Sequence, residues 1–217
     1  MNPELNPCFQ LNLDLAGRPC LVVGGGAEAT EKSGRLLDAG ARLTLVSPSI
    51  TPVLQEWSHA GKLQYFAREF RCEDLDGVFL VVNTARANPG LTQEIFAAAC
   101  ARNILINSYD QPAFSNFGMV ALVHPGHLRL SISTSNASPS LASRLRQDLE
   151  ALFDEEFIDY LEQLGRVRQH LKKSEPDREK RIELLRALVG DFHLKGQLHY
   201  PEDWRQQVEA LLNRDKS

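Results

Sequence analysis

The chain has 217 residues, of which 24 are basic and 28 acidic, giving a formal net charge of −4. Hydrophobic residues make up 43% and charged residues 24%, an ordinary globular composition that excludes a disordered or coiled-coil chain. The mild acidity argues against nucleic acid as a partner, because neutralising a phosphate backbone requires a basic surface. The longest apolar runs, such as 78–82, are far too short to span a membrane, so we expect no membrane association.

The cysteines are scattered along the chain as Cys8, Cys20, Cys72 and Cys100, and they form no CxxC pair. This spacing is typical of reduced thiols and disfavours both a disulfide framework and a structural zinc site. The first residues show no basic segment followed by an apolar one, so no secretory signal is expected. These features together predict a cytoplasmic protein without a resident metal.

Charge density divides the chain into regions of different character. Residues 1–140 hold 10 basic and 12 acidic side chains, whereas the last 77 residues hold 14 and 16. We interpret 1–115 as a dinucleotide-binding domain, 116–150 as a hairpin and helix for dimerisation and substrate contacts, and 151–217 as a helical domain.

Short apolar runs alternate with helical patterns through the first region, which predicts a doubly wound parallel sheet of the α/β class. Strands are expected at Pro19–Val23, Arg42–Val46, Leu63–Phe66, Val78–Val82 and Ile104–Asn107. Helices are expected at Glu28–Ala39, Pro52–Ala60 and Gly90–Arg102.

The rhythm changes after Asp110. Residues 119–123 and 128–133 alternate in polarity around Pro125-Gly126, which predicts a β-hairpin closed by a type II turn. Ser138 then precedes Pro139, a good N-cap before a proline at the first helical position. Leucines from 141 to 152, with Phe153, continue one helical face, and further helices fit 178–189 and 202–212.

Residues 24–29 read Gly-Gly-Gly-Ala-Glu-Ala, a GxGxxA motif between a predicted strand and a predicted helix. Gly24 permits a tight turn, Gly26 lets the backbone approach a pyrophosphate, and Ala29 allows close packing of helix and strand. The start of the helix, at Ala27 and Glu28, offers free N–H groups to phosphate oxygens. The alternative is a glycine-rich turn without a ligand, but the strand–turn–helix context favours a dinucleotide.

The second predicted strand lacks the acidic residue that normally binds the adenosine ribose. It is followed by Ser47-Pro48-Ser49, and no acidic residue occurs between Asp38 and Glu56. No arginine follows that would bind a 2′-phosphate, so the sequence does not distinguish NAD from NADP. We expect the backbone and hydroxyl groups of this segment to contact the ribose.

Two further groups follow strands at the same expected edge of the sheet. Asn83-Thr84 ends the fourth strand, near the expected nicotinamide position, and Asn107 leads into Asp110 after the fifth. Asp110 is a candidate general base, because a carboxylate is ionised at neutral pH. The alternative is that Asp110 caps a turn before Pro112, and spacing does not decide between them.

A polar loop at 133–138 opens the helix that starts at Pro139. Its hydroxyl and N–H groups are suited to binding carboxylates, although a plain capping loop is the alternative. His124 and His127 have the spacing of metal ligands, but they flank a turn and are interpreted as surface residues.

Several of these motifs in order resemble precorrin-2 dehydrogenase, the N-terminal module of siroheme synthases. The resemblance rests on Cys20–Gly26, Ala39–Thr44, Asn107-x-x-Asp110-x-Pro112 and the loop ending Ser138-Pro139. It implies a homodimer in which NAD accepts a hydride from the tetrapyrrole precorrin-2, giving sirohydrochlorin for siroheme. Some members also insert ferrous iron, using the same cleft and aspartate.

The resemblance also implies roles for individual residues. Asp110 matches the catalytic aspartate, and Ala27, Glu28, Pro48 and Ser49 match dinucleotide contacts. The substrate contacts are then expected after the fifth strand and in the polar loop before Pro139, at Asn107, Ser133, Thr134 and Ser135. The chain departs from the family pattern in this loop, since Ser135 and Asn136 stand where two glycines are usual.

Two other functions remain open beside the NAD-dependent dehydrogenase. One is a bifunctional dehydrogenase and ferrochelatase. The other is a non-catalytic dinucleotide sensor, which would need neither Asp110 nor a polar Ser/Thr loop at the cleft.

Overall fold

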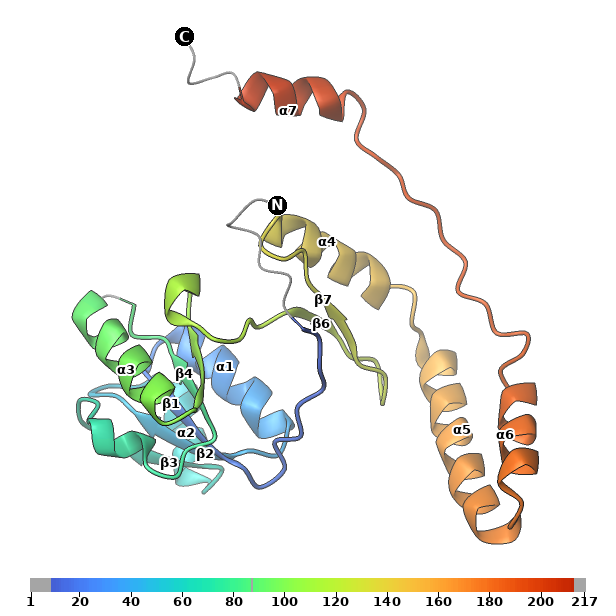
Figure 1. Ribbon diagram of the computed structural model, residues 1–217, viewed down its shortest axis with the longest axis horizontal. Coiled ribbons are helices and arrows are strands. Elements are labelled where there is room, and N and C mark those ends of the chain that lie inside the picture. The colour runs from blue at the N-terminus through green and yellow to red at the C-terminus, as the bar shows by residue number, and fades with distance from the viewer. Residues whose placement is uncertain (1–8, 87, 213–217) are drawn as a thin grey trace. The chain divides into compact units, whose positions relative to one another are not determined.

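A computed structural model of the chain describes residues 9–86 and 88–212, so Cys8 lies outside the described residues. The chain divides into two compact units, Met1–Phe153 and Asp154–Ser217 (Figure 1). The first unit contains the sheet and all of the predicted site residues.

The first unit is built on a five-stranded, fully parallel sheet in the order β3-β2-β1-β4-β5, which confirms the predicted fold class. The strands are β1 (Pro19–Val23), β2 (Arg42–Val46), β3 (Leu63–Phe66), β4 (Leu80–Asn83) and β5 (Leu105–Ser108). The first three strands match their predicted ranges. Strands β4 and β5 lie one or two residues later than predicted, because each extends to a polar residue at the carboxyl edge.

Helices cover both faces of this sheet because alternate strand residues point to opposite sides. Cys20 and Val22 pack with α1 (Ala27–Asp38) and α2 (Pro52–His59). Leu21 and Val23 pack with α3 (Pro89–Ala101) on the other face. Short 3-10 helices at Cys72–Leu75 and Pro112–Phe114 complete the connections.

The strand order reverses between β1 and β4. The connection from β1 leads to one side of the sheet and β4 lies on the other, so the carboxyl ends of these two strands form the switch point at which such sheets bind ligands. The glycine turn after β1 and the polar residues after β4 therefore meet at the same switch point.

A two-stranded antiparallel hairpin of β6 (Ala121–Val123) and β7 (Leu130–Ile132) precedes α4 (Pro139–Glu150). The predicted type II turn is wrong in register: the closing hydrogen bond runs from the Leu128 N–H to the Pro125 carbonyl. Gly126 is thus the first central residue, with φ 53°, a position that favours glycine in turns whose twist suits a hairpin.

The second unit contains α5 (Glu155–Ser174), α6 (Arg178–Ala187) and α7 (Trp204–Leu212), with α5 and α6 side by side (Figure 1). The predicted apolar face from 141 to 153 runs past the end of its helix, because α4 ends at Glu150, and Asp154 then caps α5, a helix that the sequence analysis did not predict. Phe192 packs on Phe157 and Tyr160. Through the part of this unit that the structure describes, no residue is buried.

Within the described ranges, no helix combines the length and the apolar character needed to cross a membrane.

Candidate active site

The turn between β1 and α1 contains three glycines with three different environments. Gly24 has φ 106°, and a Cβ there would lie 2.3 Å from the Thr84 hydroxyl. A Cβ on Gly25 would lie 1.9 Å from the carbonyl oxygen of Ser49. A Cβ on Gly26 would meet no protein atom within 4 Å. The turn therefore packs tightly against the neighbouring loops at two glycines and leaves open space at the third.

Helix α1 is capped differently from the five helices α2 to α6. Each helix from α2 to α6 is preceded by an N-cap residue whose side chain accepts a hydrogen bond from the first turn, namely Thr51, Asn88, Ser138, Asp154 and Asp177. The N-cap of α1 is Gly26, which has no side chain to accept one. Its first N–H groups are thus left for an acceptor from outside the helix, and the open space at Gly26 gives such a group access. These features fit the pyrophosphate of a dinucleotide.

The loop after β2 forms the second wall of this site. Ser47 is buried, its hydroxyl donates to the Ser49 carbonyl at 2.7 Å, and its own carbonyl accepts from the Tyr65 phenol. Pro48 and Ser49 are exposed. Ser47 therefore shapes the loop from beneath, while its two neighbours are accessible to a ribose.

Arg68, the basic residue that follows β3, already forms an ion pair within the protein. Arg68 contacts both carboxylate oxygens of Asp74, at 2.8 Å and 2.6 Å. Burial alone would raise the pKa of Asp74, but hydrogen bonds from Arg68 and the Arg71 N–H outweigh it and lower that pKa. Arg68 is therefore committed to Asp74 rather than free for a 2′-phosphate.

Two threonines that sequence analysis did not single out join these loops. Thr30 Oγ1 donates to the Gly26 carbonyl and lies 2.8 Å from Thr51 Oγ1. The Thr51 N–H donates to the Gly25 carbonyl. The hydroxyl pair fixes the first turn of α1 to the start of α2, which holds the glycine turn in place before any ligand arrives. A β-branched polar residue four positions after Gly26 is a weak sequence signal, so only the structure identifies this pair.

The residues after β4 differ in accessibility. Asn83 is 2% exposed, its amide donates to Thr92 Oγ1, and its carbonyl oxygen accepts from the Ala85 N–H. Thr84 is half-buried, and its backbone N–H and hydroxyl both donate to the Val23 carbonyl. Both side chains hold the switch point together through protein contacts, and Thr84 is the more accessible of the two.

Asp110 lies on the exposed surface directly after β5, with φ 58°, a left-handed conformation that few residues other than glycine, Asn and Asp adopt. Its carboxylate Oδ2 lies 3.6 Å from Arg86 Nη1. This places a carboxylate and a guanidinium together at the carboxyl edge of the sheet, beside the switch point. Arg86 is a second site residue that the sequence did not reveal.

Tyr109 joins this pair to α1. The Arg86 guanidinium lies 5.6 Å from the centre of the Tyr109 ring, and the Lys32 ammonium lies 5.7 Å from it. A hydrogen bond to the Glu28 carboxylate raises the pKa of the Tyr109 phenol. The first turn of α1 and the Asp110 loop are therefore linked through one aromatic side chain.

The Ser/Thr loop before α4 has its own internal hydrogen bonds. Ser133 Oγ accepts from the Ser135 N–H, and Thr134 Oγ1 accepts from the Ser138 N–H. Ser135 and Asn136 have φ 50° and 66°, so both hold the left-handed conformation that glycine adopts without strain. The loop thus caps α4, as the alternative interpretation expects, and still presents its hydroxyl groups at the surface. Asn107, the other predicted substrate contact, is half-buried and donates its amide to the Phe117 carbonyl.

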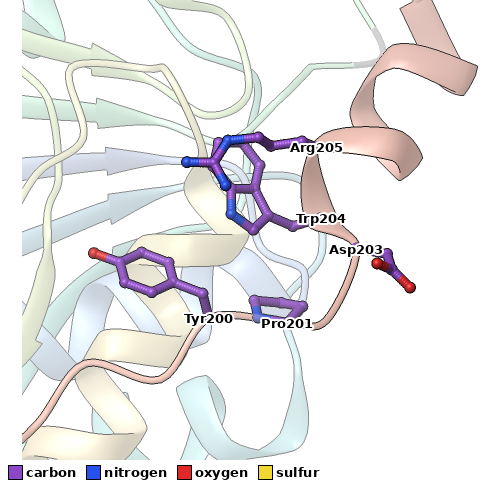
Figure 2. A pocket seen from close by; sticks show the side chains of 5 residues that line it. All are labelled: Tyr200, Pro201, Asp203, Trp204 and Arg205. Atoms are coloured by element: carbon purple, nitrogen blue, oxygen red, sulfur yellow. The ribbon is translucent and has the colours of Figure 1, made fainter.

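A hollow in the second unit is separate from the candidate site residues described above. It is lined by Tyr200, Pro201, Asp203, Trp204 and Arg205. Figure 2 shows the Arg205 guanidinium over the Trp204 ring, 4.7 Å from its centre, and the Asp203 carboxylate directed away from both. No predicted site residue lines this hollow. Across the described residues, moreover, no three His, Cys, Asp or Glu side chains gather in a way that would hold a metal ion.

The parallel sheet, the glycine turn at its switch point and the uncapped α1 together define a dinucleotide-binding domain of the Rossmann type. A family model described as putative NAD(P)-binding matches residues 11–121. A precorrin-2 dehydrogenase from Priestia megaterium is 31% identical over 204 residues, covering 93% of this chain and 98% of that protein. Siroheme synthase 1 from Aeromonas hydrophila is 34% identical over 201 residues.

The solved structure of SirC, a precorrin-2 dehydrogenase, superposes with a TM-score of 0.74 at 29% identity, covering 97% of this chain and all of that one. The chain belongs to the precorrin-2 dehydrogenase family. It covers 43% of the length of the Aeromonas siroheme synthase, which is therefore a much longer protein.

Proposed function

We propose that this protein oxidises precorrin-2 to sirohydrochlorin with NAD as the hydride acceptor. The observation that carries the proposal is the pairing of an uncapped α1 with an exposed aspartate at the same edge of the sheet, in a chain of this family. A non-catalytic sensor would require the first feature and not the second.

The turn after β1 supplies the cofactor site in this proposal. Gly24 allows the tight turn, Gly26 leaves open space, and the N–H groups of Ala27 and Glu28 bind the pyrophosphate. The ribose lies against the loop that Ser47, Pro48 and Ser49 form after β2, and the nicotinamide end lies toward Asn83 and Thr84 after β4. When bound, NAD supplies the acceptor for the hydride that leaves the macrocycle.

Asp110 takes the proton that must also leave. Removing two hydrogens from precorrin-2 releases one hydride and one proton, and the acidity of that proton rises as the hydride departs. A carboxylate is a weak base that suits such a proton, and Asp110 is exposed to the space beyond the strands. The hydroxyls of Ser133 and Thr134, the Ser135 backbone and the Asn107 side chain are the proposed contacts to the substrate's carboxylates.

The test is an anaerobic incubation of the purified protein with precorrin-2 and NAD, followed by absorbance for sirohydrochlorin and for NADH. Equal amounts of both products are expected. NAD binding without any product would favour the sensor and overturn the proposal. Ferrous iron added afterwards tests the ferrochelatase alternative, for which loss of the sirohydrochlorin spectrum is the readout.

The working form in this proposal is a homodimer in the cytoplasm. The second unit leaves many large apolar side chains exposed, including Leu188, Val189 and Phe192, and buries none of those described. A helical unit with so little buried apolar surface gains stability from a partner surface, and a two-fold copy of the chain supplies one. Light scattering at micromolar concentration should give twice the mass of the chain, and a monomer would contradict the dimer.

A further inference from the structure

Four basic side chains of the first unit, on α1 and on the loops after β3 and β4, differ in how far each is already engaged. Both terminal nitrogens of the Arg68 guanidinium donate to the Asp74 carboxylate. Lys32 is paired with Glu31 and its side chain is 13% exposed. Arg35 donates to the Val120 carbonyl and lies near Glu31. Arg86 keeps 59% of its side chain exposed.

Within residues 9–86 and 88–212, no hydrogen bond engages the guanidinium of Arg86, so its donors are available there. The 3.6 Å between Nη1 and the Asp110 carboxylate is longer than a hydrogen bond, so charge alone holds this pair. The Tyr109 ring lies against the guanidinium, 5.6 Å from ring centre to carbon, and limits the directions that it can take. A planar fork of N–H donors in this state is suited to a carboxylate, which it binds through two parallel hydrogen bonds.

The charge of Asp110 creates a need for such a cation. On the proposed function, on which this inference rests, Asp110 is the base, and a substrate with several carboxylates approaches it. A second negative charge brought beside Asp110 would be repelled unless a positive charge lay between them. Arg86 lies at that place, on the loop after β4, and it reaches Asp110 on the loop after β5.

We propose that Arg86 is a specificity-determining residue that binds one carboxylate side chain of the tetrapyrrole beside Asp110. In the absence of substrate Arg86 rests against Asp110 and Tyr109. When substrate binds, the guanidinium turns its free N–H donors to the incoming carboxylate and remains close enough to offset the charge of Asp110. Arg86 contacts the substrate at its periphery and takes no part in moving the proton or the hydride.

The experiment compares Arg86→Gln and Arg86→Lys with wild type, measuring kcat and KM for precorrin-2 under anaerobic conditions. Loss of a charge-assisted contact should raise KM about tenfold or more in Arg86→Gln while kcat changes little. Arg86→Lys should fall between, because lysine keeps the charge and loses the fork. The KM of wild type should rise more steeply with salt than that of Arg86→Gln, since a charge pair is screened.

Binding of sirohydrochlorin, followed by fluorescence quenching, gives a readout that does not depend on turnover. Its Kd should rise in Arg86→Gln by about the same factor, while the Kd of NAD stays at the wild-type value. Arg102→Gln is the matched control, because Arg102 lies 3.5 Å from Asp76 in a similar exposed pair at the amino end of the strands. That variant should match wild type in both measurements.

The outcomes separate this inference from the function on which it rests. If wild type makes no sirohydrochlorin, the proposed function fails. If wild type is active and Arg86→Gln has an unchanged KM and an unchanged Kd for sirohydrochlorin, only the role of Arg86 is overturned. An equal loss in Arg102→Gln would also overturn it, since the effect would then come from net charge.

Discussion

The carbonyl oxygen of Ser49 occupies the space that a side chain on Gly25 would need. The glycine turn after β1 is thereby pressed against the loop after β2, and the Thr51 N–H bonds the Gly25 carbonyl in the same contact. Gly26, the next residue, faces open space. Two neighbouring glycines in one motif therefore serve different ends, the first for packing within the protein and the second for access of a ligand.

Substitutions at these two glycines should have opposite effects on folding and binding. Gly26→Leu should fold with near-normal stability and bind NAD about tenfold or more weakly, because the side chain fills the approach to the helix N–H groups. Gly25→Ala should lower the free energy of unfolding by about 1–3 kcal/mol, because the Ser49 backbone must move. Calorimetry with NAD and urea denaturation measure the two effects. A folded Gly26→Leu protein with normal affinity would remove the cofactor site from this turn.

Replacing Asp110 tests whether its carboxylate is the base. Asp110→Asn suits the position better than alanine does, because asparagine also tolerates the left-handed backbone found there. Turnover of precorrin-2 should fall by about 10²–10⁴-fold, the usual contribution of a positioned base.

The affinity of Asp110→Asn for NAD serves as the control and should stay close to wild type. If this variant oxidises precorrin-2 at the normal rate, Asp110 is a turn residue and the proton leaves by another route.

Two residues of the Ser/Thr loop have a left-handed backbone conformation, so replacing them with glycine should increase the stability of the protein. Ser135→Gly should raise the free energy of unfolding by about 0.5–1 kcal/mol, because relief of the strained backbone exceeds the added freedom of the unfolded chain. Asn136→Gly should gain less, since asparagine adopts this conformation more readily than serine. Thermal unfolding of both variants measures the difference. A loss of stability in Ser135→Gly would mean that the Ser135 side chain has a role of its own.

The cysteines should differ sharply in reactivity. Burial raises the pKa of the Cys20 thiol to about 11, so at pH 8 only about one molecule in a thousand carries the reactive thiolate. Cys100 is exposed and should react with a thiol reagent in the folded protein, whereas Cys20 should react only after unfolding. Mass spectrometry that locates the modified residue distinguishes the two, and rapid labelling of Cys20 in the folded protein would contradict its burial.

The same thiol gives a pH dependence with a definite sign. The folded state raises the pKa of Cys20 from 9.0 to about 11, so its contribution to stability is complete below pH 9 and is lost as pH rises through 11. Wild type should therefore lose more stability than Cys20→Ala between pH 8 and pH 10.5 in urea denaturation. An equal loss in both would assign the alkaline effect to other groups.

Periodicity predicted the sheet well because its central strands, β1 and β4, are buried on both faces and are almost wholly apolar. The same reasoning missed α5, because it carried the apolar face of the helix after Pro139 to Phe153 and assigned no helix to 155–174, whose start is marked by the cap at Asp154. It also placed the hairpin turn one residue early, because proline and glycine together fit more than one turn type.

Sequence analysis proposed the site residues that belong to a local motif and missed those that tertiary contacts bring to the site. The glycine turn and Asp110 follow strands, and their positions can be inferred from the order of elements. Arg86 and Tyr109 are identified as site residues only by their contact with each other, between two loops that lie more than twenty residues apart in the sequence. The Thr30–Thr51 pair is likewise a tertiary contact, with no local pattern to mark either hydroxyl.

The absence of a capping side chain at the start of α1 links the folding of this protein to the supply of its cofactor. Helices α2 to α6 carry their own caps, so their first turns need no small molecule. The first turn of α1 is completed by the pyrophosphate that we propose for it, so its amide protons should exchange with solvent more slowly once NAD is added. At a concentration one hundred times its Kd, a ligand that binds the folded state alone adds about 2.7 kcal/mol of stability. Cells low in NAD would then hold this protein in a form that opens more often and is degraded sooner.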